Sequence, residues 1–566
     1  MTPATVQALT AGAGEKGLKE GTLGLVSSIV VGVASTAPAY SLAASLGYVV
    51  LVANGDGIVG IKAPSIMLLA FIPMYFIAVA YAELNKAEPD CGTTFTWAAR
   101  AFGPKAGWMG GWGIIVADII VMANLAQIAG SYTFLLFGLD SLADSTLWST
   151  VAGVIWIAIM TYICYRGLEL SARIQYCLLG IELAVLVAFA AYALVKVFGS
   201  NPPADAIRPS LTWLWPSGLS LSALVSATLI AVFIYWGWDS AVAVNEETKD
   251  PAKTPGRAAI LSTLLLLATY AIVSIAMVAF AGVGDSGVGL GNPDNADDIF
   301  AALGAEVFGN SAFGHVMEVL LVITVLTSAS ASTQTTILPT ARTSLSMAAY
   351  KAAPTRFARI HPHHLSPSTS TLWMGGMSIV FYVGLTLVSE NILADSIAAV
   401  GLLIAFYYGL TGFACVWFYR RTLTTGVRHF VMRGLFPFLG GVMLLGAFII
   451  AGYQYADPEY GYTSVAGIGG VFVLGIGSLV LGVILMYVWQ AKAPAYFRGE
   501  TLTKRAADEL LLAGDDGQRT RVALPDSGEM STVIAPDLSN LPPGQRAVRR
   551  ADPSDAEGRQ DDRSQE

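Results

Sequence analysis

The sequence predicts an all-α integral membrane protein with twelve transmembrane helices. Of its 566 residues, 54% are hydrophobic and only 13% are charged, whereas a soluble domain has about 25% charged residues. Apolar segments of about 20 residues, the length that crosses a bilayer, recur twelve times along the chain. Two of these segments, the first and the sixth, contain residues that interrupt a helix.

The twelve spans follow one another with short connections and begin after a polar segment, residues 1–20. They are expected near residues 22–46, 63–84, 107–136, 146–165, 172–198, 220–244, 258–282, 312–346, 371–388, 392–419, 433–454 and 463–489. The polar start has no apolar core of its own, so the first span is expected to act as the insertion signal.

The placement of lysine and arginine predicts the orientation of these spans. If the spans alternate from a cytoplasmic start, all Lys and Arg residues up to Arg505 lie on the cytoplasmic side except Lys62, Lys196 and Arg208. This distribution follows the positive-inside rule. We therefore expect a multi-pass protein of the cytoplasmic membrane, in contact with the lipid bilayer, with both termini cytoplasmic. The net charge of −8 gives no indication of nucleic-acid binding.

The two interrupted spans predict the organisation of the core. The first contains Gly32 to Pro38 and the second Tyr235 to Ser240, and exposed backbone groups at bilayer depth persist only where they line a cavity. Because five spans separate the two breaks, a five-helix repeat must be inverted relative to the membrane. The expected organisation is a cytoplasmic segment 1–20, a first repeat 21–200, an inverted second repeat 219–420, two additional helices within 433–490, and a mostly disordered cytoplasmic tail 491–566.

The longest connection between spans, residues 283–310, is acidic and has no basic residue. Asp297 is positioned to cap a short helix that runs to Phe308. A solvated loop without a helix is the alternative.

Four acidic residues are predicted within the spans, and no lysine or arginine lies at comparable depth. They are Asp118, Glu182, Asp239 and Glu318. A charge at mid-bilayer costs about 2.5 to 3.5 kcal/mol, so each acid should face a cavity, have a partner or carry a proton. This excess of acids favours a pathway for a cation. For Asp239, the alternative is that its side chain caps the half-helix after the break.

Several stretches together resemble the amino acid, polyamine and organocation permease superfamily, over about residues 20 to 430. The matching motifs are Tyr81-Ala82-Glu83-Leu84 with Pro89, Gly92, Phe95 and Ala101-Phe102-Gly103-Pro104, then Trp236-Gly237-Trp238-Asp239-Ser240-Ala241, Asn245-Glu246-Glu247-Thr248-Lys249-Asp250-Pro251 and Thr340-Ala341-Arg342. The resemblance implies an inverted five-helix repeat, alternating access, and uptake or exchange of amino acids or amines.

The resemblance also implies a substrate site at the two breaks. Amides near Ala34, Ser35, Thr36 and Ala37 would hold a substrate carboxylate, and carbonyls near Tyr235, Trp236 and Gly237, together with Asp239, would hold its amine. Phe233 aligns with the gating aromatic residue of the family. The chain departs from the family at the first break, where Thr36-Ala37-Pro38 replaces the usual Gly-Ser-Gly, and proline has no N–H to donate.

The resemblance further points to residues for ion coupling. Glu182 stands where many members carry a lysine that is proposed to substitute for sodium. It is interpreted as a proton carrier, a direct contact to a cation, or a buried structural hydrogen-bond partner. Thr327 and Ser328 belong to a hydroxyl cluster that either forms part of a sodium site or joins helices, and Asp118 and Glu318 either take part in coupling or bond to hydroxyls.

These observations predict a secondary active transporter of an amino acid, coupled to protons or exchanging substrates, with sodium possible as the coupling ion. A transporter of a polyamine or another organic amine is the close alternative, and a channel or receptor a distant one. The sequence contains no nucleophile and base pair, metal-ligand set or nucleotide loop. We therefore expect no enzyme activity, no cofactor and no metal.

Overall fold

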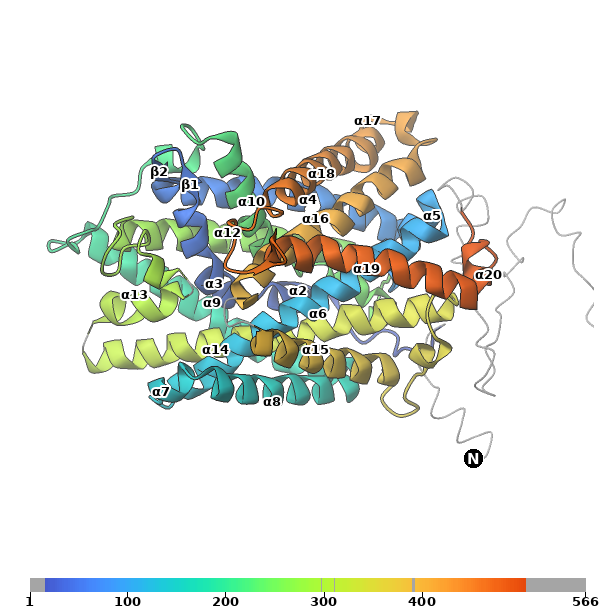
Figure 1. Cartoon of the computed structure of the whole chain (residues 1–566), viewed down its shortest axis with the longest axis horizontal. Coiled ribbons are helices and arrows are strands. Elements are labelled where there is room, and N and C mark those ends of the chain that lie inside the picture. Colours follow the sequence, from blue (N-terminus) through green and yellow to red (C-terminus); the bar gives the residue numbers. More distant parts are fainter. Residues whose placement is uncertain (1–15, 297, 310, 389–391, 505–566) are drawn as a thin grey trace, which may run out of the picture.

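The computed structural model describes residues 16–296, 298–309, 311–388 and 392–504, and these residues are predominantly helical. Figure 1 shows the long helices running side by side along the longest axis of the molecule. Eleven of the described helices are long and apolar enough to cross a membrane. The remaining predicted span, 220–244, is a shorter helix because the second break interrupts it. The predicted fold class is thereby confirmed.

The helices and strands have the following bounds. The long helices are α2 (Leu25–Thr36), α3 (Pro38–Leu51), α4 (Ala63–Ala87), α5 (Thr94–Phe102), α6 (Pro104–Leu135), α8 (Thr146–Tyr165), α9 (Leu168–Phe198), α10 (Leu221–Tyr235), α12 (Thr254–Ala281), α13 (Ile299–Phe308), α14 (Ala312–Ala349), α15 (Ser368–Val388), α16 (Ile392–Tyr419), α18 (Phe436–Gln454) and α19 (Gly470–Lys492). Short elements are α7 (Asp140–Ala143), α11 (Ser240–Ala243), α17 (Val427–His429), α20 (Pro494–Phe497), η1 (Gly60–Lys62), η2 (Leu211–Leu214), η3 (Asn245–Glu247), η4 (Pro293–Asn295), η5 (Thr355–Ala358), η6 (Leu423–Thr425), the π-helical turn η7 (Phe430–Leu435), and two hairpins, β1 (Ala53–Asn54) with β2 (Gly57–Ile58) and β3 (Ser464–Val465) with β4 (Ile468–Gly469).

The first break lies at Ala37, between α2 and α3. Its backbone is left-handed, with φ 46° and ψ 68°, and its N–H bonds to the carbonyl of Ala34 at 3.2 Å. Pro38 then occupies the first position of α3, where its missing N–H costs nothing because the first amides of a helix have no partner within the helix. The predicted break is therefore present, and the proline begins the second half-helix.

The second break lies between α10 and α11, and it packs directly against the first. Gly237 adopts φ 120°, and a Cβ at this position would lie 2.7 Å from the carbonyl carbon and oxygen of Ser35. Only glycine combines this backbone conformation with such a close approach. The two broken spans are thus in contact at their interruptions.

Other helices surround this pair and separate it from lipid. Helices α6, α9, α12 and α14 pack around the breaks, whereas α18 and α19 pack on α16 at the periphery. Large apolar side chains remain exposed on the outer helices, for example Ile155 and Ile159 on α8 and Ile484 on α19. Such an apolar outer surface suits a lipid environment.

The acidic connection before α14 contains the predicted helix, α13. Asp298 caps it by accepting a hydrogen bond from the Ala301 N–H at 3.0 Å. The predicted cap, Asp297, lies outside the described residues, and the solvated-loop alternative is wrong. Of the predicted tail 491–566, the structure describes residues up to 504, and residues 1–15 of the predicted N-terminal segment likewise lie outside the description.

Candidate functional site

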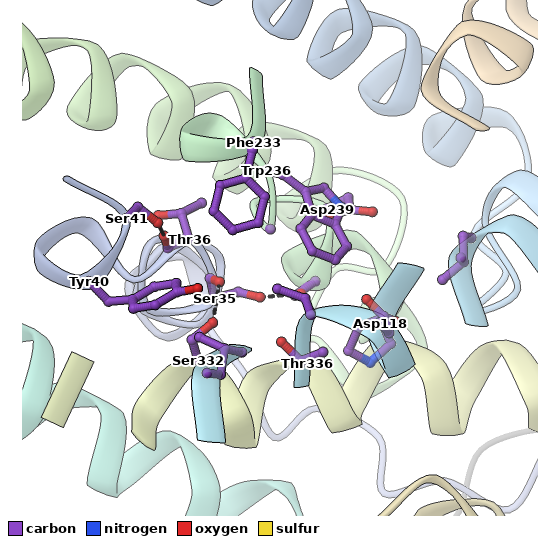
Figure 2. Close-up of a pocket in the computed structure, with 16 residues that line it drawn as sticks. Ser35, Thr36, Tyr40, Ser41, Asp118, Phe233, Trp236, Asp239, Ser332 and Thr336 are labelled. Carbon is purple, nitrogen blue, oxygen red and sulfur yellow. Dashed lines mark hydrogen bonds between the residues drawn. The ribbon is translucent and has the colours of Figure 1, made fainter. Parts of the chain in front are cut away.

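A pocket lies where the two breaks meet. Figure 2 shows polar side chains from four elements pointing into it. It is lined by Ser35, Thr36, Tyr40 and Ser41 of the first broken span, Ile114, Asp118, Val121 and Leu125 of α6, Phe233, Trp236, Gly237, Asp239 and Ser240 of the second broken span, and Ser332, Thr336 and Pro339 of α14. Every lining residue is buried. The walls of the pocket are therefore formed by interior side chains of the protein.

The carbonyl groups at the first break already have partners within the protein. The carbonyl of Ser35 accepts a hydrogen bond from Ser332 Oγ at 2.8 Å, and that of Thr36 accepts one from Ser41 Oγ at 2.6 Å. The hydroxyl of Thr36 donates to the carbonyl of Val33 at 2.6 Å. Each carbonyl that the break frees is thus bonded to a side chain or to the next turn, as buried backbone groups require.

The amides at the first break are also engaged. Pro38 has no N–H, the Ala39 N–H donates to Glu182 Oε1 at 2.8 Å, and the Tyr40 N–H donates to Ser328 Oγ at 3.2 Å. The predicted role of amides near Ala34 to Ala37 as carboxylate donors is therefore not supported by this structure, because those N–H groups bond within α2 and to Ala34. Ser35 and Thr36 do line the pocket, whereas Ala34 and Ala37 do not.

The second break leaves its backbone open. The Trp236 N–H bonds to Phe233 and the Ser240 N–H bonds to Gly237, both at 3.0 Å. Within the described part of the chain, the N–H groups of Gly237 and Trp238 and the carbonyl of Trp236 have no hydrogen-bond partner. The second break therefore offers both donors and an acceptor to a solute.

Two acidic side chains, Asp118 and Asp239, line the pocket. Asp118 accepts a hydrogen bond from the Thr340 hydroxyl, and Asp239 accepts one from the Tyr407 hydroxyl at 3.2 Å. The indole N–H of Trp236 donates to the same Tyr407 oxygen, so Tyr407 holds Asp239 and Trp236 together. None of the described residues that line the pocket is a lysine, arginine or histidine. This arrangement suits a cationic group on the solute.

The alternative prediction for Asp239, a helix cap, is wrong. Asp239 occupies the N-cap position of α11, yet its side chain makes no capping hydrogen bond. The helix has only four residues, and the carboxylate turns to Tyr407 instead. Its carboxyl group is therefore available at the pocket.

Glu182 lies behind the first break rather than in the pocket. Its Oε1 accepts hydrogen bonds from the Ala39 N–H and from Ser328 Oγ, the latter at 2.7 Å. Its Oε2 is buried and has no hydrogen-bond partner in the described residues. The side chain thus links three elements, α9, the start of α3 and α14, and has one oxygen free to carry a proton.

The remaining predicted site residues divide between the pocket and other places. The Phe233 ring points into the pocket (Figure 2). Tyr235 instead packs its ring against Phe71 and Tyr270, outside the lining residues. Thr327 donates its hydroxyl to the carbonyl of Thr324 in its own helix at 3.1 Å, so this bond joins no second helix, and the predicted sodium site stays a prediction.

Glu318 lies far from the pocket in its helix. It is in the second turn of α14, its side chain is 42% exposed, and its carboxylate lies 3.6 Å from the imidazole of His315. At 1.5 Å per residue, the 38 residues of α14 extend about 57 Å, more than the roughly 30 Å of a hydrocarbon core. Glu318 therefore lies away from the pocket, near the start of a helix that is longer than the hydrocarbon core, and its predicted part in coupling stays a prediction.

Sequence reasoning did not find Tyr40, Ser41 and Thr336, which also line the pocket. Tyr40 donates its hydroxyl to Asn124 of α6. The position of Tyr40, two residues after the helix-breaking proline, is the signal that could have identified it. Nothing local in the sequence distinguishes Thr336 from the other hydroxyl residues of α14.

At one end of the molecule, residues of the family motifs meet and close the way to the pocket. We call it the basic end; it carries α5 and α20, on the right in Figure 1. The rings of Tyr81, Trp238 and Tyr408 contact one another, with centroids 5.1 to 5.6 Å apart. Beyond them, Arg342 and Glu247 form a buried ion pair at 2.5 Å. These layers separate the pocket from solvent.

The outermost layer at the basic end is an ion cluster around Lys16. Its ammonium lies 2.8 Å from Asp90 and 2.7 Å from Glu246. Burial opposes ionisation of Asp90, but the charge and hydrogen bond of Lys16, with hydrogen bonds from Ser346 and Gly92, outweigh it, so the pKa of Asp90 lies below its usual range. Burial likewise opposes the charge of Lys16, and the surrounding carboxylates raise its pKa well above the usual value.

The same cluster contains the possible metal ligands. Among the described residues, the one group close enough to hold an ion is Asp90, Cys91 and Glu246. The Lys16 ammonium already contacts all three side chains. A lysine of the chain itself therefore already occupies the place of a cation in this cluster.

Comparison with known proteins agrees with this architecture. The sequence profile of a family described as amino acid permease matches residues 23–471. An uncharacterised transporter of Mycobacterium tuberculosis is 25% identical over 467 residues, which cover 81% of this chain and 90% of the relative. The branched-chain amino acid permease BcaP of Bacillus subtilis is 25% identical over 65% of this chain and 76% of its own length.

A third relative carries a different substrate. The low-affinity putrescine importer PlaP of Escherichia coli is 24% identical over 44% of this chain and 53% of its own length. All of these relatives are transporters rather than enzymes. The chain therefore belongs to the amino acid permease family, within the amino acid, polyamine and organocation superfamily of membrane transporters.

Proposed function

We propose that this permease is a secondary active transporter of a small organic amine. The observation that carries the proposal is the charge of the pocket, where Asp118 and Asp239 are buried and no basic residue lines the wall. An ammonium group offers these carboxylates the counter-charge that burial demands. The aromatic rings of Phe233 and Trp236 are suited to pack against its alkyl part or to face the cation.

The engaged amides of the first break support an amine over a zwitterion. A substrate carboxylate needs free donors, and the first amides of α3 already bond to Glu182 and Ser328. A negative group placed beside Glu182 would also be repelled. The putrescine importer among the relatives is consistent with an amine substrate.

An amino acid is the second candidate, and a specific feature favours it. The free N–H groups of Gly237 and Trp238 at the second break are possible donors for a carboxylate. The family description and the branched-chain amino acid permease relatives point in the same direction.

Uptake of labelled amines and amino acids into proteoliposomes distinguishes these candidates. We expect a diamine or monoamine to be taken up with saturation and to be outcompeted by other amines. Uptake of amino acids with no competition by any amine would contradict the amine proposal and favour the second candidate. Flux that does not saturate would contradict a carrier altogether.

The role of the pocket carboxylates is tested by Asp239→Asn. A hydrogen bond to a charged group contributes about 1.5 to 3 kcal/mol, so we expect kcat/KM for the amine to fall by about 10-fold to 150-fold. Glu318→Gln is the matched control, because Glu318 lies outside the pocket, and it should transport normally. Equal effects of the two substitutions would exclude a specific contact at Asp239.

We also propose that Glu182 couples transport to protons. Its carboxylate contacts the start of α3 and α14 at once, so loss of its charge on protonation would weaken the tie between the first broken span and its surroundings. A proton loaded on one side of the membrane and released on the other would then bias which side opens. The remaining possibility, a sodium ion at Glu182 and Ser328, predicts sodium dependence instead.

The variant Glu182→Gln tests the coupling. It retains the acceptor oxygen for Ala39 but cannot lose a proton. We expect uptake driven by a pH gradient to disappear while exchange of substrate across the membrane continues. An unchanged response to the pH gradient would remove Glu182 from coupling, and stimulation by a sodium gradient would replace the proton with sodium.

The orientation in the cell belongs to the same proposal. The basic end, where lysine and arginine concentrate, is assigned to the cytoplasm by the positive-inside rule. On this assignment the ion cluster of Lys16 closes the cytoplasmic side of the pocket. A reporter protein fused after Glu566 that is active only in the cytoplasm provides the test.

A further inference from the structure

A second recess lies at the basic end, far from the pocket in the fold. It is formed where the chain leaves α14 and meets the end of α19, near α20 in Figure 1. Its lining is Lys351, Ala353, Pro354, Thr355, Arg356, Trp489 and Ala493. The transport proposal uses none of these residues.

The backbone of Lys351 is unusual for its residue type. It follows the last turn of α14 with φ 62°, while its own N–H bonds to Ala348 and the Ala352 N–H bonds to Met347, at 3.0 and 2.7 Å. This is the helix-ending position that glycine usually occupies, because a side chain is strained there. Strained backbone positions of this kind are often found at functional sites, which suggests a role for the charge of Lys351.

The recess has an excess of positive charge. Within the described residues, no carboxylate lies within ion-pair distance of Lys351 or Arg356. Glu500 pairs with Arg498 at 2.5 Å, and Lys351 is close enough to contribute to lowering the pKa of Glu500. The recess therefore complements an anion rather than a cation.

The surface beside the recess is apolar and faces outward. Val480, Ile484 and Val488 of α19 are 53%, 55% and 48% exposed, and their spacing of four residues puts them on one side of the helix. Trp489 stands between this surface and the recess and donates its indole N–H to the Lys351 carbonyl at 3.2 Å. Tryptophan at this position is typical of the boundary between lipid tails and head groups.

From this combination we propose that the recess binds an anionic phospholipid of the leaflet at the basic end. The phosphate group lies against Lys351 and Arg356, and the acyl chains lie along Val480, Ile484 and Val488. Basic pockets beside transmembrane helices on the cytoplasmic side are suited to such head groups. The inference rests on the membrane location of the chain and is independent of which substrate the central pocket takes.

The test compares two lipids with the same acyl chains, added to the purified full-length protein in detergent. Dioleoyl phosphatidylglycerol should raise the melting temperature and remain bound in native mass spectrometry, whereas dioleoyl phosphatidylcholine should do neither. Inorganic phosphate alone should have no effect. Stabilisation by phosphate equal to that by the anionic lipid would overturn the proposal, because the acyl chains would then contribute nothing.

Two substitutions assign the effect to the recess. Arg356→Gln removes one cation, and Lys351→Gly removes the other while relieving its strained backbone, so the glycine variant should fold at least as well as the parent in phosphatidylcholine. We expect each to weaken binding of the anionic lipid about fivefold, and the pair about 25-fold. Lys86→Gln is the control and should retain lipid binding, because Lys86 is an exposed cation at the same end that forms no ion pair within the described residues.

The outcome is decisive in either direction. Loss of the anionic-lipid effect in Lys351→Gly and Arg356→Gln, but not in Lys86→Gln, supports the site. An undiminished effect in the double variant, or an equal loss in the control, overturns it.

Discussion

At the scale of single residues, Gly237 is the position that the arrangement of the pocket depends on most. Gly237 has a positive φ, and a Cβ there would lie 2.7 Å from the backbone of Ser35. Both the backbone conformation and the lack of space therefore exclude a side chain. We expect Gly237→Ala to destabilise the protein by about 1 to 3 kcal/mol, as over-packing of a well-packed core does, and to abolish uptake because the two breaks must separate. Thermal unfolding and proteoliposome uptake measure these two effects.

The control for this prediction is another glycine-to-alanine substitution. Gly376 lies within α15, and a Cβ there meets no atom within 4 Å. Alanine is the better helix former by about 1 kcal/mol, so Gly376→Ala should leave transport intact and stability equal or higher. Normal transport by Gly237→Ala would show that the contact between the breaks is dispensable.

The residue types predicted the two breaks correctly. They were less successful in predicting which acids lie at the pocket. Asp118, Asp239 and Glu182 are buried as predicted, since the cost of a charge in lipid is a general rule. The same rule grouped Glu318 with them, although Glu318 lies outside the pocket and is 42% exposed, because the rule depends on knowing where the hydrocarbon begins along a helix of 38 residues. The depth of a residue in the membrane depends on the assembled protein and cannot be predicted from the local pattern of apolar residues.

At the scale of elements, the sequence predicted the two interrupted spans because their causes are local. Pro38 removes an N–H and Gly237 permits a positive φ whatever surrounds them. The partners of the freed groups are not local. Glu182 and Ser328 accept hydrogen bonds from amides that lie 143 and 288 residues away in the sequence. Whether the backbone groups of each break have partners therefore depends on the packing of distant helices.

This asymmetry between the breaks gives them different tasks. The first is tied by Glu182 and by hydroxyls of α14, and its movement therefore depends on those ties. The second presents unpaired N–H and carbonyl groups to the pocket. On the proposed function, the first break is thus the element that responds to the coupling ion, and the second is the element that contacts the substrate.

At the scale of the whole molecule, the Lys16 cluster joins three distant parts of the chain. Lys16 belongs to the N-terminal segment, Asp90 to the connection between α4 and α5, and Glu246 to η3 after the second break. Leu23 adds backbone contacts with Glu247 and Lys249 beside this cluster. The two halves of the fold are thereby held together at the basic end.

The cluster should remain charged through the physiological pH range. The pKa of Asp90 is depressed, so its contribution to stability is fully present above about pH 4, the ordinary value for aspartate, and is lost only as the pH falls toward its lower folded value. The pKa of Lys16 is raised, so its contribution is lost only at high pH. The closure is therefore insensitive to a pH gradient near neutrality, unlike the proposed coupling at Glu182.

The variant Lys16→Met should open the basic end. It leaves Asp90 and Glu246 buried without their counter-charge, and breaking a buried ion pair costs about 3 to 5 kcal/mol. Cys91 reports the opening, because its sulfur is buried 3.7 Å from the Lys16 ammonium. In a Cys177→Ser background, which removes the exposed thiol, we expect maleimide labelling of Cys91 to accelerate more than tenfold at constant pH.

Lys19→Met is the matched control for this opening. Lys19 pairs with Glu169 at 2.8 Å, but both side chains are 49% exposed, and an exposed ion pair contributes only about 0 to 1 kcal/mol. Its removal should leave the labelling rate of Cys91 unchanged. If both variants label alike, or if Lys16→Met labels as slowly as the parent, the ion cluster does not hold the two halves closed, and the rings of Tyr81, Trp238 and Tyr408 with the Arg342–Glu247 pair would have to do so instead.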